Sequence, residues 1–372
     1  MKEKVRHLYE IVYSGILSDI QNGTYPPGAL LPPENEIAQV YDVSRITTKK
    51  ALDMLVEQGL VHRIRGKGTF VQKEAPTKSH AEALSTPSLL GFVLPDYSGQ
   101  FACDLMRGVE AEATERGYLL VHQRSHGIQS VEEKIIDGLK AAGIQGLIVM
   151  PVHGENYSPS FLKLVLDQFP LVFVDRYLKG LPAPCVSSDN VHSARQMVDY
   201  LVELGHQKIC FVSPPTANTS TLEDRIHGFE EGISRHGMVI DRDSQFIEVF
   251  STMPGKSGDE NADIDVNTIV EHLQNHPEIT TLFASEYNIA HLCRVACRKL
   301  NLRIPEDLSI VCYDEPSHSF GEHFFTHIRQ DEELIGRKAV QVLLDKLSGQ
   351  ESVGRNVVSS HLITGKSTSS PR

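Results

Sequence analysis

The chain has 372 residues, more than a single domain usually holds, so we expect two or three compact units. Its composition, 40% apolar and 23% charged, is that of an ordinary globular protein, and no stretch approaches the roughly 18 consecutive apolar residues of a membrane-spanning helix. The six cysteines have no framework spacing, which favours free thiols in a reducing cytoplasm. The N-terminal segment lacks a small-residue cleavage site, so we predict no signal peptide.

Basic residues are concentrated near the N-terminus. The net charge of the chain is −12, yet residues 1–73 hold ten Lys/Arg against eight Asp/Glu, and residues 43–73 hold seven against two. A locally basic head on an acidic body suits a protein that offers only its head to nucleic acid. A solvated charged face explains the same counts, so charge alone leaves both interpretations open.

Three helices are predicted before the first glycine-rich turn. The apolar side of the first, over residues 5–21, is made by Leu8, Ile11, Val12, Ile16 and Ile20. The second begins at Pro33, which suits a first helical position. Ser44 is a good N-cap for the third, which Gly59 ends. The residues of this third helix that we expect to face the core are Ala51, Leu52, Leu55 and Val56.

Residues 61–71 read VHRIRGKGTFV, in which glycine, lysine and threonine are as close together as in a phosphate-binding loop. The Walker pattern needs a longer spacing between its glycines and a following helix, and both are missing here. The alternation predicts two short strands joined by a turn at Gly66 and Gly68. Such a wing would place Arg63, Arg65 and Lys67 against a DNA backbone or minor groove, with glycine at its tip permitting close approach.

The segment from residue 22 to residue 71 resembles the winged helix-turn-helix domain of GntR-family bacterial transcription regulators, through the motifs LPPENEIA, VSRITTKKAL and GKGTFV. The resemblance implies double-stranded operator DNA as a partner. The contacts it implies come from Glu34, Arg45, Thr47, Lys49 and the wing tip around Gly66. Arginine is commoner in the family at the place of Lys49, so we expect a phosphate contact there rather than a bidentate base contact. For Arg45 and Glu34, a surface ion pair and a helix N-terminal preference are the alternatives.

The head is assigned to residues 1–73, a polar linker with two prolines to residues 74–88, and the body to residues 89–372. In the body, strands are predicted at residues 89–95, 118–123, 146–151, 170–175, 208–214, 246–250, 280–285 and 308–314. Helices are predicted between them, including residues 191–204, 221–237 and 266–276. This alternation indicates an α/β fold of two lobes with parallel, doubly wound sheets. Ligands of such sheets bind at the carboxyl ends of the strands, here in a cleft between the lobes.

Polar residues follow several of these strands. The pairs are Asp96 and Tyr97, Asp175 and Arg176, and Asp314 and Glu315. Carboxylates and a guanidinium group that converge on one cleft can bind a polyhydroxylated solute, with aromatic rings covering its apolar faces. Any one of these residues taken alone is more often a helix cap or a rim ion pair.

The body also resembles the ligand-binding domain of LacI/GalR-family regulators, through segments such as VSSDNVHSARQMVDYLVELGHQKICFVS, LNLRIPEDLSIVCYDEP, FFTHIRQDEELIG and HLITGKST. The resemblance implies the fold of periplasmic sugar-binding proteins with three crossovers between lobes, a homodimer and a small-molecule effector, expected to be a sugar. The residues it implies as effector contacts are Asp189, Arg225 and Asp314, with Tyr97, Phe101 and Leu105 in the first-lobe wall; Arg176 joins them as a strand-end guanidinium.

One departure concerns the segment ASEYNIA. The family usually shows Asn-Asp where this chain has Glu286 and Tyr287. We expect Glu286 to accept hydrogen bonds from effector hydroxyls and Tyr287 to support or stack. The change makes it unsafe to transfer the identity of any effector from the family.

Two other classes of protein were weighed. An enzyme is disfavoured because no nucleophile elbow or dinucleotide fingerprint is present. Cys293 and Cys297, one turn apart, lack further metal ligands nearby, so we predict a packed helix with no metal or cofactor. An exported sugar-binding protein would share the body but would not carry a basic winged helix. We predict a cytoplasmic, non-enzymatic transcription regulator. The resemblance to the two families implies that it is a repressor.

Overall fold

A computed structural model of the chain describes residues 8–57, 60–64, 67–72, 88–97, 99–154, 158–240, 244–253, 255–256, 258–314, 323–350 and 354–372. The chain divides into two compact units, Met1–Pro87 and Ser88–Arg372. Each is described by itself below. Over the described ranges, no helix is both long and apolar enough to span a bilayer.

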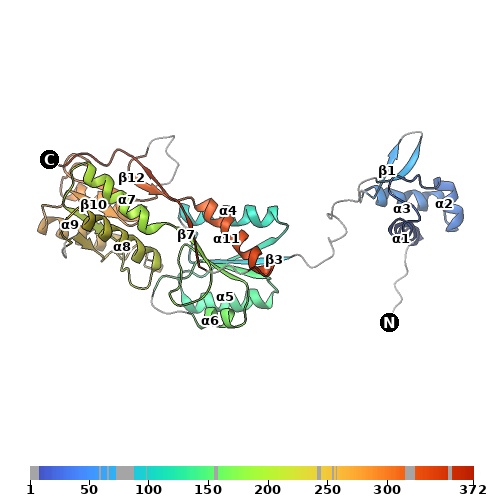
Figure 1. The fold of residues 1–372 in the computed structure, drawn as a ribbon, viewed down its shortest axis with the longest axis horizontal. Coiled ribbons are helices and arrows are strands. Elements are labelled where there is room, and N and C mark those ends of the chain that lie inside the picture. The colour runs from blue at the N-terminus through green and yellow to red at the C-terminus, as the bar shows by residue number, and fades with distance from the viewer. Residues whose placement is uncertain are drawn as a thin grey trace. The chain divides into compact units, whose positions relative to one another are not determined.

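The first unit is a small helical domain with a two-stranded wing (Figure 1). Its elements are α1 (Leu8–Gln21), α2 (Glu34–Val40), α3 (Arg45–Glu57), β1 (Val61–Ile64) and β2 (Gly68–Val71). Val12 and Ile16 pack with Leu52 and Leu55 in its core. The predicted apolar side of α1 is wrong at Leu8 and Ile11, which are about half exposed, whereas Ile20 packs against the core. Val56 is also exposed.

The ends of the helices and the turn of the wing follow local rules. The Ser44 hydroxyl accepts a hydrogen bond from the Thr47 N–H, as predicted for an N-cap. Pro33 stands one residue before the position predicted for it, as the N-cap of α2. Strands β1 and β2 pair antiparallel from Val61 opposite Val71. Gly68 has a φ of 116°, a backbone conformation that residues with a side chain rarely adopt and that glycine permits.

The second unit begins with a six-stranded parallel sheet in the order β13-β7-β6-β5-β3-β4. Its strands are β3 (Leu89–Leu94), β4 (Leu119–Arg124), β5 (Gly146–Val149), β6 (Leu171–Val174), β7 (Cys185–Ser188) and β13 (Arg355–Val358). Helices α4 (Gln100–Glu115) and α11 (Glu332–Leu347) cover one face, and α5 (Gln129–Ala141) and α6 (Pro159–Leu166) cover the other (Figure 1). Because side chains alternate along a strand, Phe92 packs under α4 and α11 while Val93 packs under α5 and α6.

A second sheet, in the order β14-β12-β11-β10-β8-β9, forms the other lobe. Its strands are β8 (Ile209–Val212), β9 (Gln245–Phe246), β10 (Thr281–Ala284), β11 (Ser309–Tyr313), β12 (Thr326–Arg329) and β14 (His361–Ile363). Helices α7 (Asn190–Glu203) and α8 (Ser220–Arg235) pack on one face, and α9 (Asp259–Asn275) and α10 (Tyr287–Lys299) on the other. All its pairings are parallel except β12 with β14. Cys293 and Cys297 are fully buried in the apolar core under α10.

The chain passes between these lobes three times. It crosses between β7 and α7, between β12 and α11, and between β13 and β14. The doubly wound two-lobed fold predicted from the alternation is confirmed, with the three crossovers that the resemblance implied. Strands β7, β12 and β13 are not among the predicted strands, and the strand predicted at residues 246–250 is reduced to Gln245–Phe246.

Candidate effector cleft and DNA-binding surface

The exposed face of α3 gathers the predicted DNA-contacting side chains of the first unit. Arg45 opens this helix with a side chain 70% exposed, and its Nε donates to Glu34 Oε2 at 3.1 Å. The Thr47 hydroxyl lies 2.8 Å from that of Ser44, and Lys49 is exposed one turn along. The Glu34 carboxylate therefore orients the Arg45 guanidinium, which remains open to a partner.

The wing joins the same ion-pair network. The Arg63 guanidinium on β1 lies 3.5 Å from Glu34 Oε1 and 2.6 Å from Asp53 Oδ1. Lys67 is exposed in the turn before β2. Two further predicted contacts, Arg65 and Gly66, lie outside the described residues. The network brings α2, α3 and β1 together, so the Arg45 and Arg63 guanidinium groups share one carboxylate.

Ile46 also lies on this surface, although it is not among the predicted DNA contacts. The side chain follows Arg45 in the first turn of α3 and is 81% exposed. Apolar side chains in that position of a recognition helix can contact the thymine methyl group in the major groove. The signal available in the sequence was a large aliphatic residue between polar ones, off the apolar side of the helix.

A cavity of about 600 Å³ lies between the two lobes of the second unit, at the carboxyl ends of their strands. Its wall includes Met150 after β5, Asp175 after β6, Pro214 after β8, Glu286 after β10 and Asp314 after β11. The strand order explains this position, since the carboxyl ends of parallel strands meet at one edge of each sheet. The volume suits a ligand of sugar size or somewhat larger.

The predicted effector residues divide into two groups. Those that line the cavity are Phe101, Arg176, Arg225, Glu286 and Asp314, together with Tyr287. Tyr97 and Asp189 are not in its wall. The Tyr97 hydroxyl lies 3.0 Å from His122 Nδ1, and the Asp189 carboxylate caps α7 by accepting from the His192 N–H. Leu105 is fully buried in the core beneath α4.

Arg225 is held rigidly although it lines the cavity. Its Nε donates to Asn190 Oδ1 at 2.8 Å and its Nη1 donates to the Ser285 carbonyl at 2.6 Å. The guanidinium carbon also lies 3.7 Å from the centroid of the Tyr313 ring. A guanidinium fixed on three sides is pre-organised for a ligand oxygen, because little side-chain entropy remains to be lost.

Two aspartates follow their strands in the left-handed region of backbone space. Asp175 has a φ of 63° and Asp314 a φ of 54°. Such residues cost about 1–3 kcal/mol and persist where the surrounding structure holds them. Gln330 does this for Asp314, donating from Nε2 to Asp314 Oδ2 at 2.7 Å. Burial raises the pKa of Asp314 to about 6 against the field of Arg225.

Two further carboxylates of the cavity wall, those of Asp175 and Glu286, lie near arginine side chains. Arg176 Nε lies 3.6 Å from Asp175 Oδ2, and its Nη1 donates to the Pro151 carbonyl. Burial raises the pKa of Asp175 and of Glu286, while Arg176 and Arg225 act in the opposite direction on both. Burial and the same Arg176 lower the pKa of His153 to about 4, so that this imidazole is neutral at pH 7.

Residues that the sequence analysis did not assign also line the cavity, notably Asp104, His153, Gln330 and Glu332. Glu332 is the first residue of α11, in the motif RQDEELIG. Burial first, and then the charges of Asp314 and Asp104, raise its pKa to about 8. Its position just after the second crossover was the available signal, because the crossovers border the cleft.

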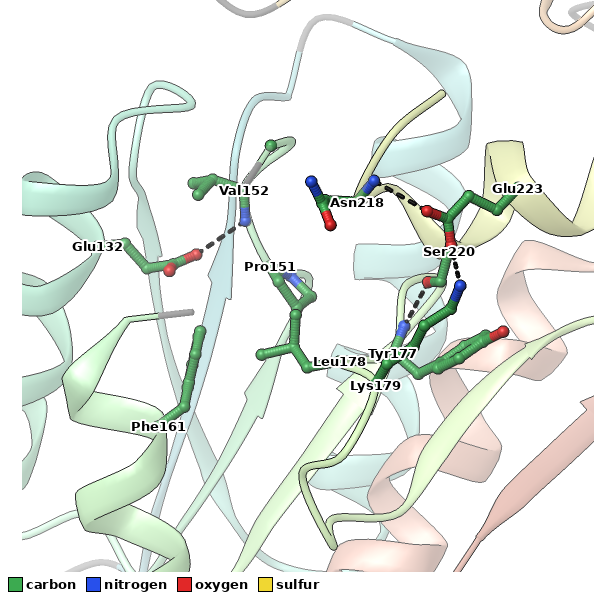
Figure 2. Close-up of a pocket in the computed structure, with 11 residues that line it drawn as sticks. Glu132, Pro151, Val152, Phe161, Tyr177, Leu178, Lys179, Asn218, Ser220 and Glu223 are labelled. Atoms are coloured by element: carbon green, nitrogen blue, oxygen red, sulfur yellow. Dashed lines mark hydrogen bonds and ion pairs between the residues drawn. The ribbon is translucent and has the colours of Figure 1, made fainter. Parts of the chain in front are cut away.

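A second, much smaller cavity of about 30 Å³ lies beside the place where the lobes touch (Figure 2). Glu132 lies at one side of it and accepts a hydrogen bond from the Val152 N–H at 3.0 Å. Across the cavity, the Tyr177 N–H donates to the Ser220 hydroxyl at 2.8 Å, and Lys179 Nζ lies 2.5 Å from Glu223 Oε2 (Figure 2). These contacts tie the loop after β6 to α8.

Asp224 on α8 completes this set of contacts between lobes. Its Oδ1 accepts from the Tyr177 hydroxyl at 3.0 Å, and its Oδ2 lies 2.7 Å from Arg355 Nη2 on β13. The Arg355 guanidinium carbon lies 4.4 Å from the centroid of the Tyr177 ring. We call these three residues the interlobe latch, because they join the two lobes through one carboxylate.

Comparisons with known proteins match the two units separately. Residues 8–71 match the family described as bacterial regulatory proteins, gntR family, and residues 198–368 match the periplasmic binding protein-like domain. The chain is 27% identical over 379 residues to the arabinose metabolism transcriptional repressor of Geobacillus stearothermophilus, with 99% of each chain covered.

Solved structures share the fold of the body. Transcription regulator CcpA of Lactococcus lactis has a TM-score of 0.66 at 18% identity, covering 76% of this chain and 100% of that one. A complex of transcriptional regulator CelR with cellobiose has a TM-score of 0.64 at 20% identity, covering 91% of this chain and 100% of that one.

The fold and the two surfaces thus define a DNA-binding protein whose larger unit holds a ligand-sized cleft between two lobes. The matches confirm both resemblances seen in the sequence. The chain is a transcription regulator that joins a gntR-family winged helix-turn-helix head to a periplasmic-binding-protein-like body.

Proposed function

We propose that this regulator is a cytoplasmic repressor whose affinity for operator DNA is controlled by a small-molecule effector, a sugar or a sugar derivative, bound in the cleft of about 600 Å³. The observation that carries the proposal is the convergence of Arg176, Arg225, Glu286 and Asp314 from both lobes on that cleft. Carboxylates and guanidinium groups fixed in this way can bind the hydroxyls of such a solute bidentately. The likeness to CelR, which was solved in complex with cellobiose, and to the arabinose repressor supports the choice of ligand class.

The head binds DNA through the exposed face of α3 and through the wing. Arg45 reads a base edge and Lys49 contacts a phosphate, with Glu34 orienting Arg45. Arg63, Arg65, Gly66 and Lys67 lie along the backbone or minor groove. Two heads, presented by a homodimer of the body, would meet a roughly two-fold symmetric operator. Selection of random duplexes with the full chain tests this role, because it should recover a sequence with two related half-sites.

The effector acts by favouring one arrangement of the lobes. It can shift DNA affinity only by its preference for that arrangement over others. The interlobe latch supplies contacts that exist only while the lobes are joined, so a ligand that bridges the cleft stabilises the same arrangement. If saturating effector leaves DNA affinity unchanged, the proposed coupling between effector binding and DNA binding is wrong, even if the chain binds both partners.

The effector role is tested by the melting temperature of the full chain against pentoses, hexoses, disaccharides and their derivatives. A ligand at about 100 times its Kd adds roughly 2.7 kcal/mol to the free energy of unfolding. Arg225→Lys should lose the shift, whereas Glu306→Gln, an acidic position outside the cavity wall, should keep it. Chemical turnover of the ligand would point instead to an enzyme. If no compound stabilises the chain, the proposal that the cleft binds an effector of this class is refuted.

A further inference from the structure

Three acidic side chains in the wall of the cavity lie close to one another. Asp104 comes from α4, Asp314 follows β11, and Glu332 begins α11, so both lobes contribute to it. We call these three residues the acidic pole. It consists of carboxyl groups close enough for each to perturb another, since Asp104 and Asp314 both raise the pKa of Glu332.

The cations of the cavity wall are distributed unevenly. Among the described residues of the wall there are five carboxyl groups and three arginines, so full ionisation would leave two excess negative charges. Arg176 and Arg225 both lie in reach of Asp175 and Glu286, which balances that half of the cavity. The third arginine of the wall is Arg329, an exposed residue at the end of β12.

The acidic pole itself is poorly neutralised. Asp104 pairs with Arg107, a rim residue whose side chain is 61% exposed, at 2.8 Å. Asp314 lies in the field of Arg225 but takes its hydrogen bonds from Gln330. Within the described part of the chain, Glu332 forms no ion pair with any lysine, arginine or histidine. The excess of carboxyl groups over arginines is therefore concentrated here.

A buried acceptor beside the pole lacks a donor. Gln330, 3% exposed, lies in the cavity wall and commits its Nε2 to Asp314. Its Oε1 is buried and receives no hydrogen bond from any residue that the structure describes. Leaving such an atom unpaired in the folded protein is unfavourable, and a donor on a ligand would satisfy it. Unlike the carboxyls, an amide oxygen cannot become a donor by taking a proton.

The chemistry of the acidic pole selects among ligands. A phosphate or carboxylate placed here would meet two or three carboxyl groups in a desolvated site and be repelled. A neutral hydroxyl can donate one hydrogen bond, but it leaves the charge excess unchanged. A protonated amine brings three donors and the missing positive charge together, and so allows Glu332 and Asp314 to ionise in the complex.

We propose that the effector of this cleft is a sugar bearing a protonated amino group, seated against Asp104, Asp314 and Glu332. Its hydroxyls face Arg176 and Arg225 at the balanced half of the cavity. This inference rests on the proposed effector function and narrows the ligand to a cationic class. Glu332 is the residue that confers the preference for the charged nitrogen, because none of the described lysines, arginines or histidines forms an ion pair with it.

The test measures affinity of the full-length chain by calorimetry for matched pairs, glucosamine with glucose and galactosamine with galactose, beside glucose 6-phosphate. We expect an amino sugar to bind at least tenfold more tightly than its neutral parent, and the phosphate to bind more weakly than either. Glu332→Gln should remove the preference for the amine, so that the amino sugar and its neutral parent bind with similar affinity. The matched control, Glu306→Gln, should leave the preference intact, because it removes a carboxylate outside the cavity wall.

The pH dependence gives a second readout. Glu332 takes up a proton below about pH 8 and Asp314 below about pH 6. Acidification should therefore weaken the binding of the amino sugar, with little effect on the binding of its neutral parent. If the neutral parent or the phosphate binds as tightly as the amine, or if Glu332→Gln keeps the preference, the amine assignment is overturned and the effector role stands. If neither amino sugars nor neutral sugars bind at millimolar concentration, this inference and the effector role both fall.

Discussion

Replacing Asp224 by asparagine should weaken the interlobe latch by about 1–2 kcal/mol. The substitution keeps the shape of the side chain but removes the charge that two partners share, the Tyr177 hydroxyl at 3.0 Å and Arg355 Nη2 at 2.7 Å. The Asp224 side chain is only 12% exposed, whereas that of Arg355 is 34% exposed, so solvent screens part of the ion pair.

The magnitude follows from the two contacts. A partly exposed ion pair contributes up to about 1 kcal/mol. A hydrogen bond to a charged acceptor contributes about 1.5–3 kcal/mol, against roughly 1 kcal/mol for a neutral one. The loss applies to the joined arrangement of the lobes, so it changes the ratio of joined to separated lobes by about 5–30-fold.

The assay is a double-mutant cycle in urea with Asp224→Asn and Arg355→Gln in the full chain, followed by far-UV circular dichroism because the chain contains no tryptophan. The control is Lys179→Gln, which breaks an interlobe ion pair whose lysine is 62% exposed and should cost no more than about 0.5 kcal/mol. A coupling energy indistinguishable from zero would refute the reasoning, because it would show that the contact between Asp224 and Arg355 adds no stability.

Three further predictions concern the head and the cleft. Arg45→Ala should cost about 1–3 kcal/mol at the selected operator and relax its sequence preference, measured by titration of labelled duplexes; unchanged affinity and specificity would show that Arg45 forms only a surface ion pair. Arg225→Lys should lower effector affinity at least tenfold, since a lysine cannot reproduce the fork that Asn190 and Ser285 hold; DNA binding by the same protein checks its folding. Glu332→Gln should stabilise the free protein by about 1–3 kcal/mol near pH 8 and hardly at all near pH 4.5. The folded-state pKa of Glu332 is raised to about 8, so its carboxyl costs stability progressively as the unfolded state ionises above pH 4.5; equal melting shifts at both pH values would contradict this.

Much of the architecture is encoded locally and could be predicted from the sequence. The Ser44 cap, the glycine-bearing turn of the wing and the strand-helix alternation of the body each depend on neighbouring residues, whose backbone preferences are strong. The same locality explains why Arg176 and Asp314 could be placed at the cavity, because each lies just after the carboxyl end of a strand. Strand ends converge in every doubly wound sheet.

Tertiary structure decided what local patterns could not. Strand β7 and the crossovers depend on pairing between residues far apart in the chain, such as Cys185 with Arg355, which no nearby residue signals. Asp189 stands at a crossover, yet its carboxylate turns to cap α7. Glu332 looks like an ordinary acidic residue at a helix start, and it belongs to the cavity only because α11 returns to the first lobe and packs against α4. Sequence therefore determined most of the elements and their order, while long-range packing determined the remaining strands, which charges share the cleft and how strongly these charges repel each other.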